Sequence, residues 1–188
     1  MEILAHTLWT TAGVRIVKNK LKNKGNPPKI NIIWAAFWGV FPDLFAFTIP
    51  FVLSFYKVII GAQSFGSFES RHQVADGFGI SHTLYQYSHS LVIWILIFLF
   101  VWAILRRPSW VMLGWALHII LDIPSHSLAF FPTPFLFPIS EYRFSYGVSW
   151  GTPWFMLINY LTLLVIWGSL FFKKYHKPKI SNIQNPID

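Results

Sequence analysis

The sequence predicts an all-α membrane protein, a polytopic helix bundle of four long spans and a short N-terminal helix. Of its 188 residues, 54% are hydrophobic and 19% are aromatic, whereas only 12% are charged. This composition is far too apolar for an ordinary soluble domain. Four apolar stretches are long enough to cross a bilayer. The basic residues fall in short clusters between these stretches, as in the cytoplasmic loops of membrane proteins.

The N-terminal segment Glu2–Val17 precedes the spans. It begins with an acid, lacks a basic start and has no small-residue cleavage site, so it does not resemble a signal peptide. Two alternatives are open: an amphipathic helix on the cytoplasmic surface, or a short helix that crosses from outside to inside. The crossing helix is favoured because it places His6 at the same depth in the membrane as the other ionisable residues. The lysine-rich stretch 18–29 is expected to be a cytoplasmic linker.

The four spans are expected to form a single domain over residues 1–172. Basic clusters precede the first span, separate the second from the third and follow the fourth, so the positive-inside rule places them and the basic tail 173–188 in the cytoplasm. The two outer connections, about Lys57–His89 and Leu128–Thr152, are long and rich in aromatic residues, Gly, Ser and Pro. The expected spans are Ile30–Tyr56, Ser90–Leu105, Ser109–Ser125 and Pro153–Phe172.

The net charge of +8 does not indicate a nucleic-acid partner. The basic clusters lie beside apolar runs, where membrane topology and anionic lipids account for them. We therefore expect membrane lipids as partners and no nucleic acid. The absence of cysteine excludes disulfides and thiolate zinc sites, so a metal would have to bind His, Asp, Glu or water.

A histidine and an aspartate stand four residues apart inside the third span. On a helix these side chains share one face, a turn apart, and ionisable groups in a membrane-length apolar segment indicate a functional site. At 1.5 Å per helical residue, five ionisable residues from four segments lie about 14 to 25 Å above the basic ends of those segments, in the outer half of a bilayer about 30 Å thick. These candidate metal ligands are His6, Asp43, His89, His118 and Asp122.

Each candidate ligand also has a structural alternative. Asp43 follows Pro42 and could cap a helix that restarts there. His89 with Ser90 could form an interfacial N-cap, and His6 could be a surface histidine on an amphipathic helix. The pair in the third span could hydrogen-bond to each other and stabilise the bundle without a metal.

Other ionisable residues are weaker candidates. His126 is the next i+4 position after Asp122, but Pro124 perturbs the helix between them. Glu141 and Arg143 lie in the second outer connection. They either contribute to the function of the site or are surface residues at its edge. Solvated positions are expected for three further histidines, His72, His82 and His176.

Four short motifs follow one another along the chain: Ala5-His6-Thr7, Phe41-Pro42-Asp43, Ser88-His89-Ser90-Leu91 and Gly114-Trp115-x-x-His118-x-x-x-Asp122. Together with the Pro- and Phe-rich stretch 131–138, this order resembles the predicted membrane-bound metal-dependent hydrolases of bacterial inner membranes. The resemblance covers roughly Met1–Pro138 and implies that the ionisable residues of these motifs bind a metal.

One motif departs from that family. Many relatives carry His-Arg-Gly-x-Thr-His-Ser where residues 84–90 of this chain read Leu-Tyr-Gln-Tyr-Ser-His-Ser, so only the second histidine is matched. The ligand order Asp, His, His-x-x-x-Asp is also loosely similar to that of zinc-dependent phospholipase C and related nucleases. That similarity suggests a reaction class, the cleavage of phosphate esters.

The resemblance implies hydrolysis assisted by a divalent metal, with zinc favoured and manganese or iron as alternatives. A bound metal lowers the pKa of its water toward about 7 and polarises a phosphoryl or acyl oxygen. Asp43 or Asp122 would act as general base, and His6 or His126 would complete a second metal site or protonate a leaving group. A site toward the outer face would be reached by a lipid or lipid-linked ester or phosphoester.

Two other functional classes stay open. A transporter would use the same residues to bind and pass a metal ion or proton, although four or five spans without an inverted repeat argue against it. A non-catalytic scaffold would use the polar cluster only to hold helices together. A stoichiometric bound metal would indicate the enzyme, and transmembrane flux would indicate the transporter. The absence of both would indicate the scaffold.

Overall fold

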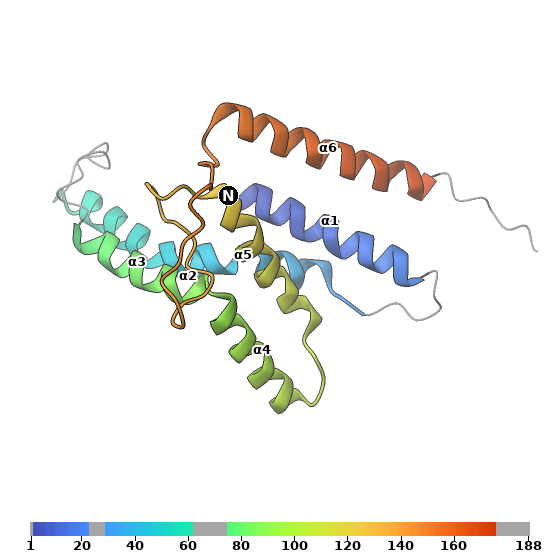
Figure 1. The fold of residues 1–188 in the computed structure, drawn as a ribbon, viewed down its shortest axis with the longest axis horizontal. Helices are drawn as coiled ribbons and strands as arrows, with labels where there is room; N and C mark the ends of the chain where they lie inside the picture. Colours follow the sequence, from blue (N-terminus) through green and yellow to red (C-terminus); the bar gives the residue numbers. More distant parts are fainter. Residues whose placement is uncertain (1, 23–28, 62–74, 176–188) are drawn as a thin grey trace, which may run out of the picture.

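The structure, a computed structural model, describes residues 2–22, 29–61 and 75–175. Over these ranges the chain folds into α-helices, one 3-10 turn and irregular connections, with no strand (Figure 1). The expectation of an all-α helix bundle is therefore confirmed. Of the expected basic tail, residues 173–175 continue the last helix, and the remainder lies outside the described residues.

Helix α2 (Ile32–Ile59) is the central element, because α1, α3 and α5 all pack against it. Its start is defined by Asn31, whose side chain accepts hydrogen bonds from the backbone N–H groups of Ile33 and Trp34, as an N-cap does. The helix of 28 residues continues through Pro42 without a break. The alternative that Asp43 caps a restarted helix is therefore wrong.

Helices α1 (Ile3–Lys22) and α6 (Pro153–Tyr175) lie side by side and run in the same direction (Figure 1). The expectation of an N-terminal helix is confirmed, although α1 extends into the stretch that was expected to be a linker. Lysine is a good helix former, and the Lys18 ammonium donates to the Ile30 carbonyl. Polar contacts join the two helices along their length: Glu2 with Tyr160, Trp9 with Asn159, and Arg15 with Trp167.

Helices α3 (Ala75–Ser88) and α4 (Leu91–Leu105) form a bent pair, whose parts meet at 59°. Residues 75–88 were expected to be part of an outer connection, and this expectation is wrong because they form a helix. Helix α3 contains glycines and few strongly apolar residues, so its sequence gives a weak periodic signal, and packing against α2 compensates. At the bend, Ser90 caps α4 and the Leu91 N–H donates to the Phe135 carbonyl.

Helix α5 (Leu113–Ser125) follows a single 3-10 turn, η2 (Trp110–Met112), and is largely enclosed by protein. Seven of its 13 residues are buried. At 1.5 Å per residue α5 is about 20 Å long, shorter than a hydrocarbon core of about 30 Å. The expectation that Ser109–Ser125 forms a long span is therefore wrong.

Within the described ranges, two helices are long and apolar enough to cross a membrane, α2 and α6. The bent pair adds a third span if residues 79–105 are counted as one. The expected number of four long spans is therefore too high. Sequence windows count apolar residues but do not distinguish a helix that faces lipid from one that is enclosed by other helices, and α5 is of the second kind.

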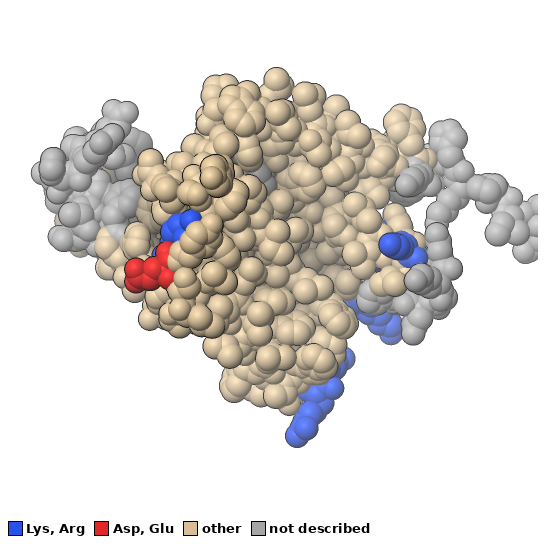
Figure 2. All heavy atoms as spheres, in the orientation of Figure 1, with Lys and Arg blue, Asp and Glu red and all other residues tan. Residues whose placement is uncertain are grey.

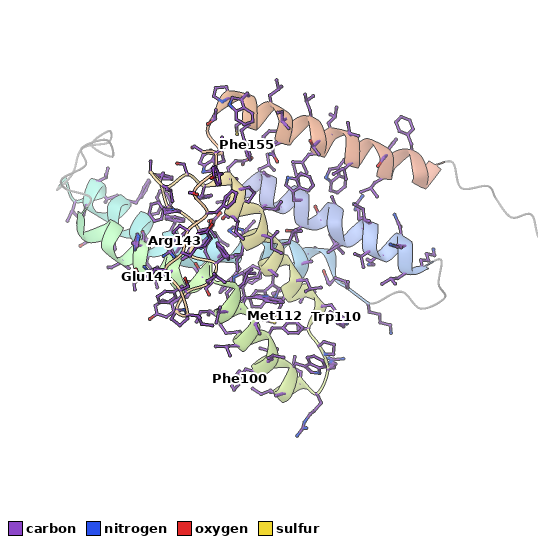
Figure 3. The ribbon with its side chains drawn as sticks, in the orientation of Figure 1. Phe100, Trp110, Met112, Glu141, Arg143 and Phe155 are labelled. Carbon is purple, nitrogen blue, oxygen red and sulfur yellow. The ribbon has the colours of Figure 1, made fainter. Side chains whose placement is uncertain are left out.

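Two hydrophobic clusters hold the helices together. One joins α4 to α5 through Phe98, Met112, Trp115 and Ile119, and the other joins α1 to α6 around Ala5 and Leu163. Figure 3 shows Met112 on the inner side of this α4–α5 contact, whereas Phe100 projects outward from α4.

The outer surface is unusually apolar. Large hydrophobic side chains are exposed along α2, α4 and α6, and Figure 2 shows a broad uncharged area with charged groups near its ends. An exposed apolar area of this extent is typical of a membrane-facing surface. The structure therefore supports a membrane protein.

Candidate metal centre

Four ionisable side chains from three parts of the fold converge at the centre of the bundle. Asp43 comes from α2, His89 from the bend between α3 and α4, and His118 and Asp122 from α5. Each offers one ligand atom, and these four atoms lie within 4.8 Å of one another. Both histidines and Asp122 are fully buried, and the Asp43 side chain is 13% exposed. The structure thus brings four of the five candidate ligands together.

The distances between the ligand atoms match those around a small cation. His118 Nε2 lies 3.0 Å from His89 Nε2 and 3.1 Å from Asp122 Oδ2. His89 Nε2 lies 3.5 Å from Asp122 Oδ2, and Asp43 Oδ1 lies 3.4 and 3.7 Å from the two imidazoles. Tetrahedral ligands at about 2.0–2.1 Å from zinc would lie about 3.3 Å apart. The observed separations fall on both sides of that value.

A backbone carbonyl sets the orientation of His118. Its Nδ1 lies 2.8 Å from the carbonyl oxygen of Gly39, which can only accept a hydrogen bond. The proton of the neutral ring is therefore on Nδ1, and the lone pair of Nε2 is directed into the cluster. This is the arrangement in which a second hydrogen bond fixes the tautomer of a metal-binding histidine.

The second imidazole, that of His89, has a hydroxyl partner. Its Nδ1 lies 2.9 Å from the Ser88 Oγ, which can donate or accept. This geometry also permits a metal-free arrangement, in which His89 Nε2–H donates to His118 Nε2 while Ser88 donates to His89 Nδ1. The centre can therefore hold either a cation or a proton between its two imidazoles.

Small residues one helical turn from the ligands allow α1, α2 and α5 to approach closely. A Cβ on Gly114 would lie 2.5 Å from the Ala35 carbonyl oxygen, and a Cβ on Gly39 would clash with the side chain of Thr10. Gly39 precedes Asp43 by four residues, and Gly114 precedes His118 by four. The close contact of the backbones at these positions is what brings ligands of different helices together.

The bend that presents His89 is fixed by aromatic residues. The Tyr85 ring stacks on the imidazole of His89 with centroids 3.7 Å apart, and the Trp115 Nε1 donates to the Ser88 carbonyl at 2.6 Å. Ser90 is the N-cap of α4, so the N-cap expected at this pair of residues is present, whereas His89 itself is fully buried and offers a ligand atom to the cluster. Sequence reasoning missed Tyr85 and Ser88, although Ser88 stands next to a candidate ligand.

Two further histidines approach Asp122 from its other side. His6 Nε2 lies 3.1 Å and His126 Nε2 3.5 Å from Asp122 Oδ1. The imidazole of His6 stacks on that of His118, with centroids 3.6 Å apart. His6 is fully buried, so it is not a surface histidine. Although α5 ends at Ser125, the His126 side chain still turns back to Asp122.

The remaining candidates lie away from this cluster or outside the described residues. His82 is exposed on α3, as expected. Glu141 and Arg143 lie in the connection between α5 and α6 (Figure 3), where the Arg143 guanidinium donates to the carbonyls of Glu141 and Tyr142. The two residues left, His72 and His176, lie outside the described residues.

The family model described as "YdjM inner membrane protein" matches residues 1–181, which is nearly the whole chain. No curated protein and no solved structure matches.

Proposed function

Because the chain belongs to the YdjM inner membrane protein family, we propose that it is a membrane-embedded metalloenzyme that hydrolyses an ester or phosphoester of a lipid or lipid-linked substrate. The observation that carries this proposal is the cluster of two imidazoles and two carboxylates enclosed by apolar helices. Ionisable groups at such a place are costly and are typically functional.

The four residues fit a divalent cation. Asp43 and Asp122 bring two negative charges into a buried site, and neutral imidazoles do not balance them, whereas a divalent cation does. The nitrogen and oxygen donors suit zinc, and they also suit manganese or iron. When bound, the cation supplies a Lewis acid for a phosphoryl or acyl oxygen and lowers the pKa of a water molecule.

The two carboxylates have different environments, which supports different roles. Asp122 is fully buried and contacts four imidazoles, so we assign it to holding the cation. The Asp43 side chain is partly exposed, and a group that takes a proton from water must be within reach of water. We therefore assign Asp43 the role of general base.

A lipid substrate is supported by a crevice beside the centre. The crevice has a volume of about 110 Å³ and is open to the outside between α2, α3 and α4. Ser88 lines it and also contacts the Nδ1 of His89. The other lining residues are apolar or aromatic: Phe41, Phe45, Tyr87, Ile93, Ile97 and Trp115. Such walls suit an acyl or isoprenoid chain better than a sugar or nucleotide.

The distribution of charge supports a membrane orientation with the centre toward the outer face. Arg106 and Arg107 follow α4 and lysines end α1, and Figure 2 shows basic atoms at the lower and right edges of the molecule, where Figure 1 places the ends of these helices. The connection that carries Glu141 lies near the opposite end (Figure 3). By the positive-inside rule the basic end is cytoplasmic. The parallel packing of α1 on α6 supports a crossing α1 as well.

The first test is elemental analysis of the full-length protein purified in detergent without chelator. We expect at least one zinc, manganese or iron per chain, and loss of metal in His118→Ala and Asp122→Ala. His82→Ala is the matched control, because His82 is an exposed histidine away from the cluster, and it should keep its metal. Wild-type protein that stays metal-free even after incubation with each ion would overturn the proposal.

A second measurement separates hydrolysis from transport. Metal-loaded protein would be reconstituted into vesicles of phospholipid that contain a lipid-linked phosphate, and product release and ion flux would be followed together. We expect cleavage that Asp43→Asn abolishes. Flux of the metal or of protons without cleavage would instead identify a transporter.

A further inference from the structure

The two oxygens of Asp122 face two different pairs of histidines. Oδ2 lies near His118 and His89, at 3.1 and 3.5 Å. Oδ1 lies near His6 and His126, also at 3.1 and 3.5 Å. We propose that Asp122 bridges two divalent cations and that the second cation is bound by Asp122 Oδ1, His6 Nε2 and His126 Nε2. This inference rests on the proposed function, which supplies the first cation.

The hydrogen bonding of His126 supports a cation on the Oδ1 side. Its Nδ1 lies 2.8 Å from the Phe131 carbonyl oxygen, so Nδ1 carries the proton of the neutral ring. The lone pair of His126 Nε2 is then directed toward Asp122 Oδ1. Two such lone pairs repel each other unless a proton or a cation lies between them. The same arrangement, with the Gly39 carbonyl, orients His118 on the Oδ2 side.

His6 gives a second and independent indication. It is fully buried, and neither of its ring nitrogens has a hydrogen-bond partner. Its Nε2 is 3.1 Å from Asp122 Oδ1 but is not oriented to donate a hydrogen bond to it. Burial of a polar group without a partner is unfavourable. A cation between His6 Nε2 and Asp122 Oδ1 would give this buried nitrogen a partner.

The two distances from Asp122 Oδ1 fit this assignment. Ligand atoms around an ion that binds them at about 2.0–2.1 Å lie about 3.3 Å apart, and both contacts of Oδ1 are close to that value. A carboxylate that binds one ion through each oxygen is a feature of two-metal sites, in which the ions are about 3.5–4 Å apart.

Two cations would also narrow the substrate class. The cluster contains two carboxylates, Asp43 and Asp122, whose charges balance only one divalent cation. A pair of cations therefore keeps a net positive charge, which attracts an anionic phosphoryl group more strongly than a neutral carboxylic ester. Two-metal sites stabilise both the attacking and the leaving oxygen of a displacement at phosphorus. The substrate is thus a phosphoester.

The test is manganese binding to the full-length protein, followed by metal analysis and electron paramagnetic resonance. We expect two Mn²⁺ per wild-type chain and the spectrum of an exchange-coupled pair. His126→Ala and His6→Ala should each bind one Mn²⁺ and show the six-line signal of an isolated ion. His82→Ala, the matched control, should match wild type.

The wild-type spectrum decides the question even if a variant fails to fold. A six-line signal alone at saturating Mn²⁺, with one ion per chain that His118→Ala removes, would overturn the second site and leave the first intact. If wild type binds no Mn²⁺, Zn²⁺ or Fe²⁺ at all, the proposed function fails together with this inference.

Discussion

At the scale of single residues, the geometry of the centre depends on groups that are not among its four candidate ligands. The Gly39 carbonyl fixes the tautomer of His118, and the Phe131 carbonyl does the same for His126. The third histidine, His89, relies instead on the side chain of Ser88. Backbone carbonyls cannot be removed by substitution, but a serine can, so Ser88 is the accessible test of this orientation.

Replacing Ser88 with alanine should weaken metal binding about 10- to 100-fold, the usual cost of removing a hydrogen bond that orients a metal-binding histidine. Competition with a fluorescent chelator measures the change. Ser169→Ala is the control, because Ser169 is an exposed serine on α6. Unchanged affinity in Ser88→Ala would show that the Tyr85 ring alone is enough to orient the imidazole.

At the scale of helices, the centre requires α2 and α5 to cross within backbone contact, with the Thr10 side chain of α1 packed against the same crossing. Gly114 lies against the carbonyl of Ala35, a rigid group that cannot move without shifting α2. Asp43 lies two turns further along α2, and His118 one turn further along α5. A small displacement at the crossing would therefore separate their ligand atoms.

Gly114→Ala should destabilise the bundle by about 1–3 kcal/mol, the usual effect of overpacking, and should weaken metal binding as well. Thermal unfolding in detergent measures the first effect. The matched control is Gly168→Ala on α6, where a Cβ meets nothing within 4 Å. The control should be neutral or stabilising by about 0.5–1 kcal/mol, because alanine favours helix more than glycine does. Equal melting temperatures for both variants would refute this account of the crossing.

The sequence predicted helices and ligands unequally well. Helices α2 and α6 were found because long apolar runs that face lipid give an unambiguous signal. Helix α3 was missed because its sequence has no strong apolar periodicity. It is held instead by packing against α2. Helix α5 was found but was taken for a long span, because an apolar sequence does not show whether its residues face lipid or protein. Most residues of α5 are buried in the protein.

The ligand cluster could be predicted because depth along a helix is simple arithmetic. His118 and Asp122 share a helix face, and Asp43 and His89 lie at comparable depths on neighbouring segments. The sequence could not predict that the two oxygens of Asp122 face different pairs of imidazoles, because this depends on the rotation of one carboxylate. The glycines that precede two ligands by four residues were a signal in the sequence that went unused.

At the scale of the whole molecule, the charged groups mark the two membrane surfaces. The basic residues that follow α4 lie at the lower edge, where that helix ends (Figures 1 and 2), and the connection with Glu141 lies on the left (Figure 3). Because the natural sequence contains no cysteine, a single introduced cysteine reports on its own location without background labelling.

Glu141→Cys should react with a membrane-impermeant maleimide in spheroplasts, because the proposed orientation exposes it outside. Arg107→Cys should react only after the membrane is permeabilised. Labelling is read by the mass shift of the purified protein, and the unsubstituted chain is the control for background. The opposite pattern would invert the orientation and place the centre near the cytoplasmic face.

The candidate ligands of the centre are spread along the chain from His6 to His126, so the order of synthesis decides when the set is complete. Translation produces His6, Asp43 and His89 first, and the last three, His118, Asp122 and His126, follow on α5 and directly after it. A nascent chain that ends before α5 has too few donors to retain an ion. Because metal binding is coupled to folding, ion capture belongs to the final docking of α5. In cells starved of metal, the unfilled carboxylates would lower the stability of the finished bundle and expose it to membrane proteases.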